Sequence, residues 1–161
     1  MNVNPDGARA GDFDFLAGSW TIKNRRLKTR WSGSDEWEHF DGNSTCWTVL
    51  GGAGSIEELR IPVDQPRGLG IRLLDTERGL WSDHWVSRGS GVIVSSPMWG
   101  AFKDGVGTFV ATDDHDGEIA IWSRGVWDCI TPTGCRWHQA FSRDCGKTWE
   151  DNWFMLWTRV A

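Results

Sequence analysis

One short segment of the sequence, Trp81–Trp85, holds a carboxyl and an imidazole between two indoles. In a β-strand the side chains of Trp81, Asp83 and Trp85 share one face, and the side chain of His84 lies on the other. If the shared face is buried, Asp83 either pairs with a cation or has its pKa raised. A raised carboxyl can move a proton and a paired one can orient a ligand, so Asp83 is our first catalytic candidate, with His84 beside it.

Other polar residues could complete such a site. Arg72, Arg124 and Arg159 are the cations that could pair with the carboxyl. A carbonyl or a developing oxyanion could be held by Arg72, Arg124 or Gln139. Glu57 and Glu58 are adjacent, so one of them faces each side of a strand. We expect Glu58 to be the inward one and a second carboxylate candidate.

Strand alternation extends the same face to neighbouring segments. Large apolar side chains recur at every second position and predict an inner face. Its ligand-binding candidates are Trp81, Trp85, Trp122, Arg124, Trp137, Gln139, Trp153, Met155, Trp157 and Arg159. The segment at 68–74 stays open, because either Leu69, Ile71 and Leu73 or Gly70, Arg72 and Leu74 could face inward.

The elements that position these residues read as strands. Apolar residues recur at period two, turn signals such as Asp104-Gly105 and Asp116-Gly117 fall between them, and helical periodicity is almost absent. We expect strands near 19–28, 36–50, 55–61, 68–74, 80–87, 97–102, 107–113, 118–128, 135–142 and 149–159. About ten antiparallel strands with short connections predict a single all-β, closed up-and-down barrel over residues 1–161. Ten strands should enclose a cavity, residues 1–12 should be a flexible segment, and a β-sandwich is the alternative fold.

Both ends of the chain carry a resemblance. The segment Phe13-Asp14-Phe15-Leu16-Ala17-Gly18-Ser19-Trp20 resembles the opening of lipocalin-like (calycin) domains, in which a G-x-W motif begins the first strand. The segment Gln139–Glu150, followed by Asn152-Trp153 and Arg159, is similar to a bacterial family of lipocalin-like domains of uncharacterised function. The resemblance implies a barrel and no settled reaction. Asp83-His84 departs from the pattern, which has an apolar residue and then Tyr before the Trp.

Composition excludes several classes of function. The formal net charge is −5 with both signs interspersed, which disfavours nucleic acid as a partner. No apolar run approaches the roughly 18 residues of a membrane span, and the first residues lack the pattern of a signal peptide, so we expect a cytoplasmic protein without a membrane partner. An exposed barrel wall is compatible with a homodimer.

The cysteines and histidines predict no metal site and no cofactor. The four cysteines have no C-x-x-C spacing and should be reduced thiols, and the four histidines have no H-x-H or H-E-x-x-H spacing. Haem, which would need His84 or His138 to point inward, is less favoured. The pattern Ser142-x-Asp144-x-Gly146-x-x-Trp149 matches a single Asp box, which we interpret as a hairpin brace.

The 13 tryptophans allow three interpretations. They could fill a barrel that has few aliphatic residues, line a pocket for a flat aromatic ligand, or form an outer platform that stacks on sugars. The candidates for the sugar platform are Trp31, Trp37, Trp47, Trp99 and Trp127. The leading hypothesis is a barrel that binds a small, mainly apolar or aromatic molecule, with a cofactor-free cyclase, isomerase or dehydratase and a non-enzymatic carrier or sensor as its two versions.

Overall fold

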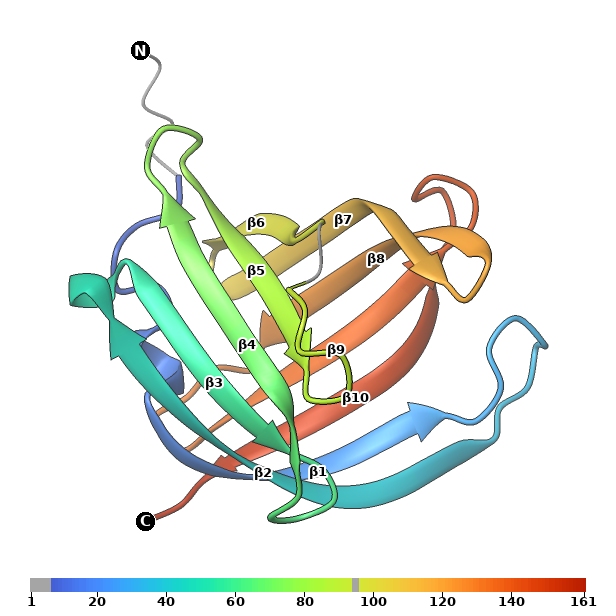
Figure 1. The fold of residues 1–161 in the computed structure, drawn as a ribbon, viewed down its shortest axis with the longest axis horizontal. Coiled ribbons are helices and arrows are strands. Elements are labelled where there is room, and N and C mark those ends of the chain that lie inside the picture. The colour runs from blue at the N-terminus through green and yellow to red at the C-terminus, as the bar shows by residue number, and fades with distance from the viewer. Residues whose placement is uncertain (1–6, 94–95) are drawn as a thin grey trace.

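The computed structural model describes residues 7–93 and 96–161 and consists almost entirely of β-strands (Figure 1). Two short 3-10 helices, η1 (Asp14–Leu16) and η2 (Leu50–Gly52), precede β1 and β3. The strands are β1 (Gly18–Leu27), β2 (Trp37–Val49), β3 (Gly54–Arg60), β4 (Pro66–Asp75), β5 (Leu80–Ser87), β6 (Met98–Lys103), β7 (Val106–Asp116), β8 (Ile119–Asp128), β9 (Gly134–Ser142) and β10 (Glu150–Arg159). No helix in the described part of the chain has the length and apolar character needed to cross a membrane.

The ten strands form one closed barrel in which each strand pairs antiparallel with its neighbours in sequence. The barrel closes where β1 pairs with β10, from Trp20 opposite Arg159 to Arg26 opposite Trp153. Closure satisfies both edges of the sheet, which explains how long strands with short connections avoid exposed backbone edges. The predicted ten-strand up-and-down barrel is confirmed, and the alternative β-sandwich is wrong.

Aromatic side chains fill one end of the barrel and form its floor. Phe13 is buried and packs edge-to-face against Trp81 and Phe102, with ring centroids 5.0 Å apart in both cases. Trp127 and Trp157 pack against each other with centroids 5.3 Å apart, and Trp157 continues the cluster to Trp20. We call Phe13, Trp20, Trp81, Trp127 and Trp157 the aromatic floor. A cavity remains inside the barrel beside this floor.

The residues just before η1 are tied to this end of the barrel. The Ala8 amide donates to the Gly79 carbonyl, and the Gly11 amide donates to the Gly52 carbonyl, each within 3.0 Å. The Asp12 carboxylate accepts a hydrogen bond of 3.1 Å from the Trp81 indole. These bonds link residues 8–12 of the segment expected to be flexible (1–12) to the barrel, and residues 1–6 lie outside the described residues.

Candidate functional site

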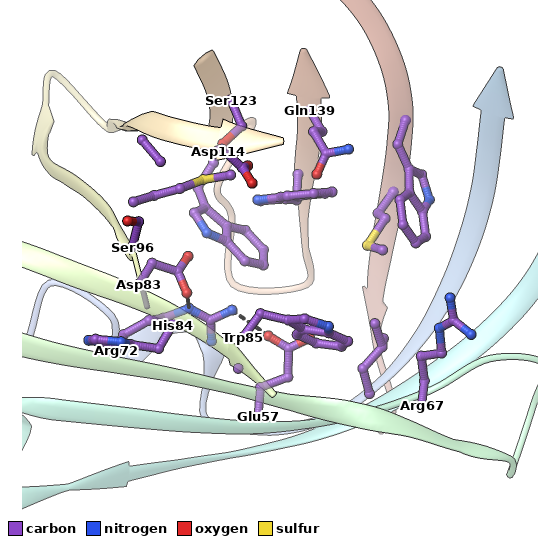
Figure 2. A pocket seen from close by; sticks show the side chains of 18 of the residues that line it. Glu57, Arg67, Arg72, Asp83, His84, Trp85, Ser96, Asp114, Ser123 and Gln139 are labelled. Carbon is purple, nitrogen blue, oxygen red and sulfur yellow. Dashed lines mark hydrogen bonds and ion pairs between the residues drawn. The ribbon is translucent and has the colours of Figure 1, made fainter. Parts of the chain in front are cut away.

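A cavity of about 330 Å³ lies above the aromatic floor, inside the barrel (Figure 2). Its size falls at the lower end of the range for small-molecule sites. The residues that line it are Glu57, Leu59, Arg67, Gly70, Arg72, Asp83, His84, Trp85, Ser96, Met98, Ala111, Asp114, Ser123, Trp127, Trp137, Gln139, Trp153, Met155 and Trp157. Five of them are tryptophans, so most of the wall is aromatic and only a few polar groups interrupt it.

The main polar group is Arg72, which lies between two carboxylates (Figure 2). Arg72 and Asp83 are directly opposite each other in the β4–β5 ladder, with Nε and Oδ1 3.6 Å apart. Arg72 Nη2 also donates a short hydrogen bond to Glu57 on β3. Arg72 and Glu57 are each only 4% exposed, so this is a buried ion pair inside the barrel.

The guanidinium rests on the aromatic floor. Arg72 Cζ lies 5.3 Å from the ring centroid of Phe13 and 5.4 Å from that of Trp127. Aromatic faces attract a cation, and this attraction is stronger where water is excluded. Nearby negative charge raises the pKa of Arg72 further above its ordinary value, despite burial, so the guanidinium is charged at every accessible pH.

Burial raises the pKa of Asp83, because the cavity wall removes water from its charged form. The Arg72 guanidinium opposes this rise, and the negative charge of Glu57 adds to it. The pKa of Asp83 therefore lies above its ordinary value although an arginine is its direct neighbour across the ladder. A raised pKa is one of the properties that mark carboxyl groups at functional sites.

Three inward glycines make room for the large side chains of the site. A Cβ on Gly70 would lie 3.0 Å from Arg72 Nη2 and 3.1 Å from Glu57 Oε2, so any larger residue would crowd the ion pair. A Cβ on Gly68 would lie 2.6 Å from the Trp85 ring, and one on Gly125 would lie 3.0 Å from Trp137 Nε1. Glycine in a strand commonly marks such close approaches.

The opposite wall carries smaller polar groups. Gln139 donates a hydrogen bond of 2.9 Å from Nε2 to the side-chain Oδ1 of Asn152, which fixes its orientation. Ser123 is fully buried, and its Oγ has no hydrogen-bond partner among residues 7–93 and 96–161. Asp114 also lines the cavity on this side (Figure 2).

The structure brings most of the predicted site residues together. Asp83, His84, Arg72, Trp85, Trp137, Gln139, Trp153, Met155 and Trp157 all line the cavity. The open question at 68–74 is decided in favour of Gly70 and Arg72, the choice that buries a guanidinium. Glu57 compensates that charge, which is why burial of the arginine is tolerated.

Glu58 is not in the cavity, so the prediction that it faces inward is wrong. Its carboxylate pairs with Arg60 at 2.7 Å on the outer face of β3. Glu57 takes the inner position because it lies opposite Gly70 in the β3–β4 ladder, beside Arg72. The pairing register therefore decides between the two glutamates, and the sequence of β3 alone did not reveal it.

Trp122 and Arg124 also lie outside, and their predicted inward orientation is wrong. Ser123 and Trp127 take the inner face of β8 instead. Trp122 packs under the β9–β10 connection, where a Cβ on Gly146 would lie 2.9 Å from its ring, and Arg124 Cζ lies 4.4 Å from the Trp149 ring centroid. The connection covers this part of the outer surface, so the large apolar side chain of Trp122 is half-buried outside the barrel.

Trp81 and Arg159 belong to the closed end of the barrel. Trp81 is fully buried in the aromatic floor, and it does not line the cavity. Arg159 donates from Nη1 to the Ala17 carbonyl and from Nη2 to the Phe15 carbonyl, both at 2.6 Å, and its Cζ lies 4.2 Å from the Trp20 ring centroid. Arg159 therefore fastens η1 to the end of the barrel.

The histidines differ in their surroundings. His84, predicted to point outward, borders the cavity, and its Nε2 lies 3.0 Å from Ser82 Oγ. His138 stacks on Phe154 on the outer wall and approaches Asp128 at 3.3 Å. Within the described ranges, no group of three or more His, Cys, Asp or Glu side chains is arranged to hold a metal ion.

The tryptophans proposed as a sugar platform lie in different surroundings. Trp127 is 1% exposed and lines the cavity, so its place on an outer platform is wrong. Trp47 is 48% exposed. Trp31 stacks against Phe141, and Trp37 lies against Arg25, whose Cζ is 4.5 Å from its ring centroid.

Sequence reasoning missed several lining residues, chiefly Glu57, Ser123, Trp127 and Met98. Ser123 and Trp127 were both missing from the predicted lining, because assigning the wrong face of a strand inward misplaces all of its residues. Ile121, Ser123, Gly125 and Trp127 alternate along β8 and mark its inner face, but this pattern is weak. The large apolar Trp122, on the opposite face, outweighed it. Glu57 could have been found by asking which glutamate could reach a buried Arg72.

No protein-family model matches this chain, and no curated protein matches it. Among solved structures, the crystal structure of Rv2717c from M. tuberculosis is similar over 94% of this chain and 99% of that chain, with a TM-score of 0.60 and 10% sequence identity. At that identity the likeness shows the fold alone. It supports the closed ten-strand antiparallel barrel.

Proposed function

We propose that this protein binds a small molecule with an apolar or aromatic body in the barrel cavity. The observation that carries the proposal is the cavity itself, which five tryptophans line and which ends on a buried Arg72 with two carboxylates. Aromatic walls supply stacking and edge contacts for a flat ring system, and a few fixed polar groups supply orientation.

A titration with 2-acetylnaphthalene, followed by tryptophan fluorescence and by calorimetry, tests this function. Saturable binding of one molecule per chain is expected. Ala111 is 4% exposed and lines the cavity, so Ala111→Leu should reduce the affinity by about tenfold or more by filling space. Ala120→Leu, on the exposed face of β8, is the matched control and should leave the affinity unchanged. No saturable binding, or equal loss in both variants, would contradict the proposal.

A second candidate is a cofactor-free enzyme of the cyclase, isomerase or dehydratase type, in which Asp83 moves a proton and Arg72 holds an oxygen of the substrate. The raised pKa of Asp83 inside the cavity favours this version over a carrier. General acid–base catalysis by one group typically contributes a factor of about 10² to 10⁴. The enzyme version therefore predicts a large loss of turnover when this one carboxyl is replaced.

Incubation of the protein with a metabolite extract, analysed by mass spectrometry, separates enzyme from carrier. An enzyme should deplete one compound and accumulate its isomer or dehydrated product, and Asp83→Asn should stop this while 2-acetylnaphthalene still binds. A carrier should retain a compound unchanged. Conversion at the same rate by wild type and Asp83→Asn would remove Asp83 from the mechanism.

A further inference from the structure

Donor groups without acceptors are concentrated where the cavity meets the aromatic floor. Arg72 Nη1, Trp127 Nε1 and Trp157 Nε1 are buried, and none has a hydrogen-bond partner among the described residues. The three side chains are neighbours: Arg72 Cζ lies 5.4 Å from the Trp127 ring centroid, and the two indole centroids are 5.3 Å apart. Buried polar groups are normally hydrogen-bonded, so such a cluster needs an explanation.

The acceptors at the same end already face Arg72. Glu57 accepts the hydrogen bond from Arg72 Nη2, and Asp83 Oδ1 lies 3.6 Å from Arg72 Nε, within ion-pair distance but beyond hydrogen-bond distance. The opposite wall adds Ser123 Oγ, which is buried and, within 7–93 and 96–161, has no partner. The buried groups without a partner at this end are therefore N–H donors of Arg72, Trp127 and Trp157, with the Ser123 hydroxyl on the opposite wall.

The charges that face the cavity disfavour an ionised ligand. Three carboxylates, Glu57, Asp83 and Asp114, and two guanidinium groups, Arg67 and Arg72, line it, with the imidazole of His84 at its border. A further anion would add to an excess of negative charge in a poorly solvated space. A cationic ammonium group would bring further N–H donors to an end where the unpartnered buried groups are already donors, and it would face Arg72.

We infer that the ligand presents a neutral hydrogen-bond acceptor, a carbonyl oxygen, to Arg72 and Trp127 at the inner end of the cavity. This inference rests on the proposed function and names the chemical class of its ligand: an aromatic or apolar ketone, quinone, lactone or amide.

Four probes that share a naphthalene body test the inference: 2-acetylnaphthalene, 2-ethylnaphthalene, 2-naphthoate and 2-naphthylmethylammonium. Each is titrated into the purified full-length protein near pH 8. The ketone should bind about tenfold more tightly than the hydrocarbon, because a hydrogen bond to a charged donor is worth a factor of that order or more. The naphthoate and the ammonium compound should both bind more weakly than the ketone.

Two double variants locate the acceptor site. Glu57→Gln with Arg72→Met removes the inner ion pair without leaving a lone charge, and it should abolish the preference for ketone over hydrocarbon. Glu58→Gln with Arg60→Met removes the outer ion pair of the same strand and should keep that preference. If the inner double variant does not fold, the comparison of the four probes on the wild-type protein decides by itself.

The outcomes separate the two proposals. Equal affinity for ketone and hydrocarbon overturns the inference and leaves binding in the cavity intact. Tightest binding of the naphthoate or of the ammonium compound overturns it in favour of an ionised ligand. If none of the four probes binds, the proposed function fails and this inference fails with it.

Discussion

Glu57 and Glu58 are adjacent and chemically identical, yet they occupy opposite environments. Glu57 is 4% exposed and paired with buried Arg72, whereas Glu58 pairs with Arg60 at the surface. Removing one partner of a buried pair leaves an uncompensated charge, but exposed pairs contribute little.

Glu57→Gln should therefore lower the free energy of unfolding by about 3 kcal/mol, because Arg72 loses its hydrogen-bonded carboxylate. Glu58→Gln should lower it by less than about 1 kcal/mol. Urea denaturation followed by tryptophan fluorescence measures both. Equal effects of the two substitutions would show that the assignment of faces in β3 is wrong.

The raised pKa of Asp83 predicts that the free energy of unfolding depends on pH. Burial raises its pKa above the value of about 3.9 in the unfolded chain, so the folded state binds this proton more tightly. The stability that this carboxyl contributes is fully present below about pH 3.9 and is lost as the pH rises through the folded pKa.

Asp83→Asn has no such proton to lose. Its free energy of unfolding, relative to wild type, should rise as the pH increases from about 4 through the folded pKa of Asp83. Asp151→Asn, at an exposed position of β10, is the control for a general change in net charge. A difference between Asp83→Asn and wild type that does not vary with pH would contradict the raised pKa.

At the scale of the element, the β9–β10 connection contains the Asp box, whose hydrogen bonds stabilise the turn between the two strands. Asp144 accepts hydrogen bonds from the Ser142 hydroxyl at 2.8 Å and from the Thr148 amide and hydroxyl at 2.8 and 2.6 Å. The Gly146 amide donates to Ser142 Oγ, and the Trp149 indole donates to the Gly146 carbonyl. The hydrogen bonds to Asp144, of which that from the Thr148 hydroxyl has the largest effect, lower the pKa of its carboxyl to about 2.

Asp144→Ala should lower the urea midpoint at neutral pH, because the turn loses three hydrogen bonds to one carboxylate. A lowered pKa means that the stabilisation is present above the unfolded pKa of about 3.9 and is lost as the pH falls toward 2. The difference in urea midpoint between Asp144→Ala and wild type should therefore decrease as the pH falls from about 4. A constant gap would show that the carboxylate acts through something other than these bonds.

Strand alternation predicted the inner faces of β9 and β10 and failed on β8. Trp137, Gln139, Trp153 and Met155 lie in the cavity as expected, because on those strands the large side chains also face inward. On β8 the rule selected Trp122, which is large and apolar but covered from outside by a loop. The sequence pattern reports burial, and burial outside a barrel looks the same as burial inside it.

At the scale of the molecule, the ten strands and the up-and-down order could be predicted, since period-two patterns and turn signals are local. The residues that line the cavity could not be predicted, because they depend on the pairing registers of the strands and on which end of the barrel the N-terminal segment closes. The site around Arg72 joins residues from β3, β4 and β5 with the floor beneath them.

Closure of the barrel also predicts the reactivity of the four cysteines. Cys46 and Cys135 are buried, and burial raises the pKa of each thiol to about 12, whereas Cys129 and Cys145 are exposed. A thiol reagent such as DTNB should titrate two thiols quickly in the native protein and all four in urea. Fast reaction of all four thiols in the native protein would contradict a closed barrel.

The central claim is that a small aromatic molecule binds inside the barrel, and the side-chain N–H signals of the 13 tryptophans test it most directly. In ¹⁵N NMR spectra, 2-acetylnaphthalene should shift the indole signals of the cavity residues Trp85, Trp127, Trp137, Trp153 and Trp157 and leave those of Trp31, Trp37, Trp47 and Trp99 in place. Shifts confined to the outer tryptophans, or no shifts at saturating probe, would contradict the account.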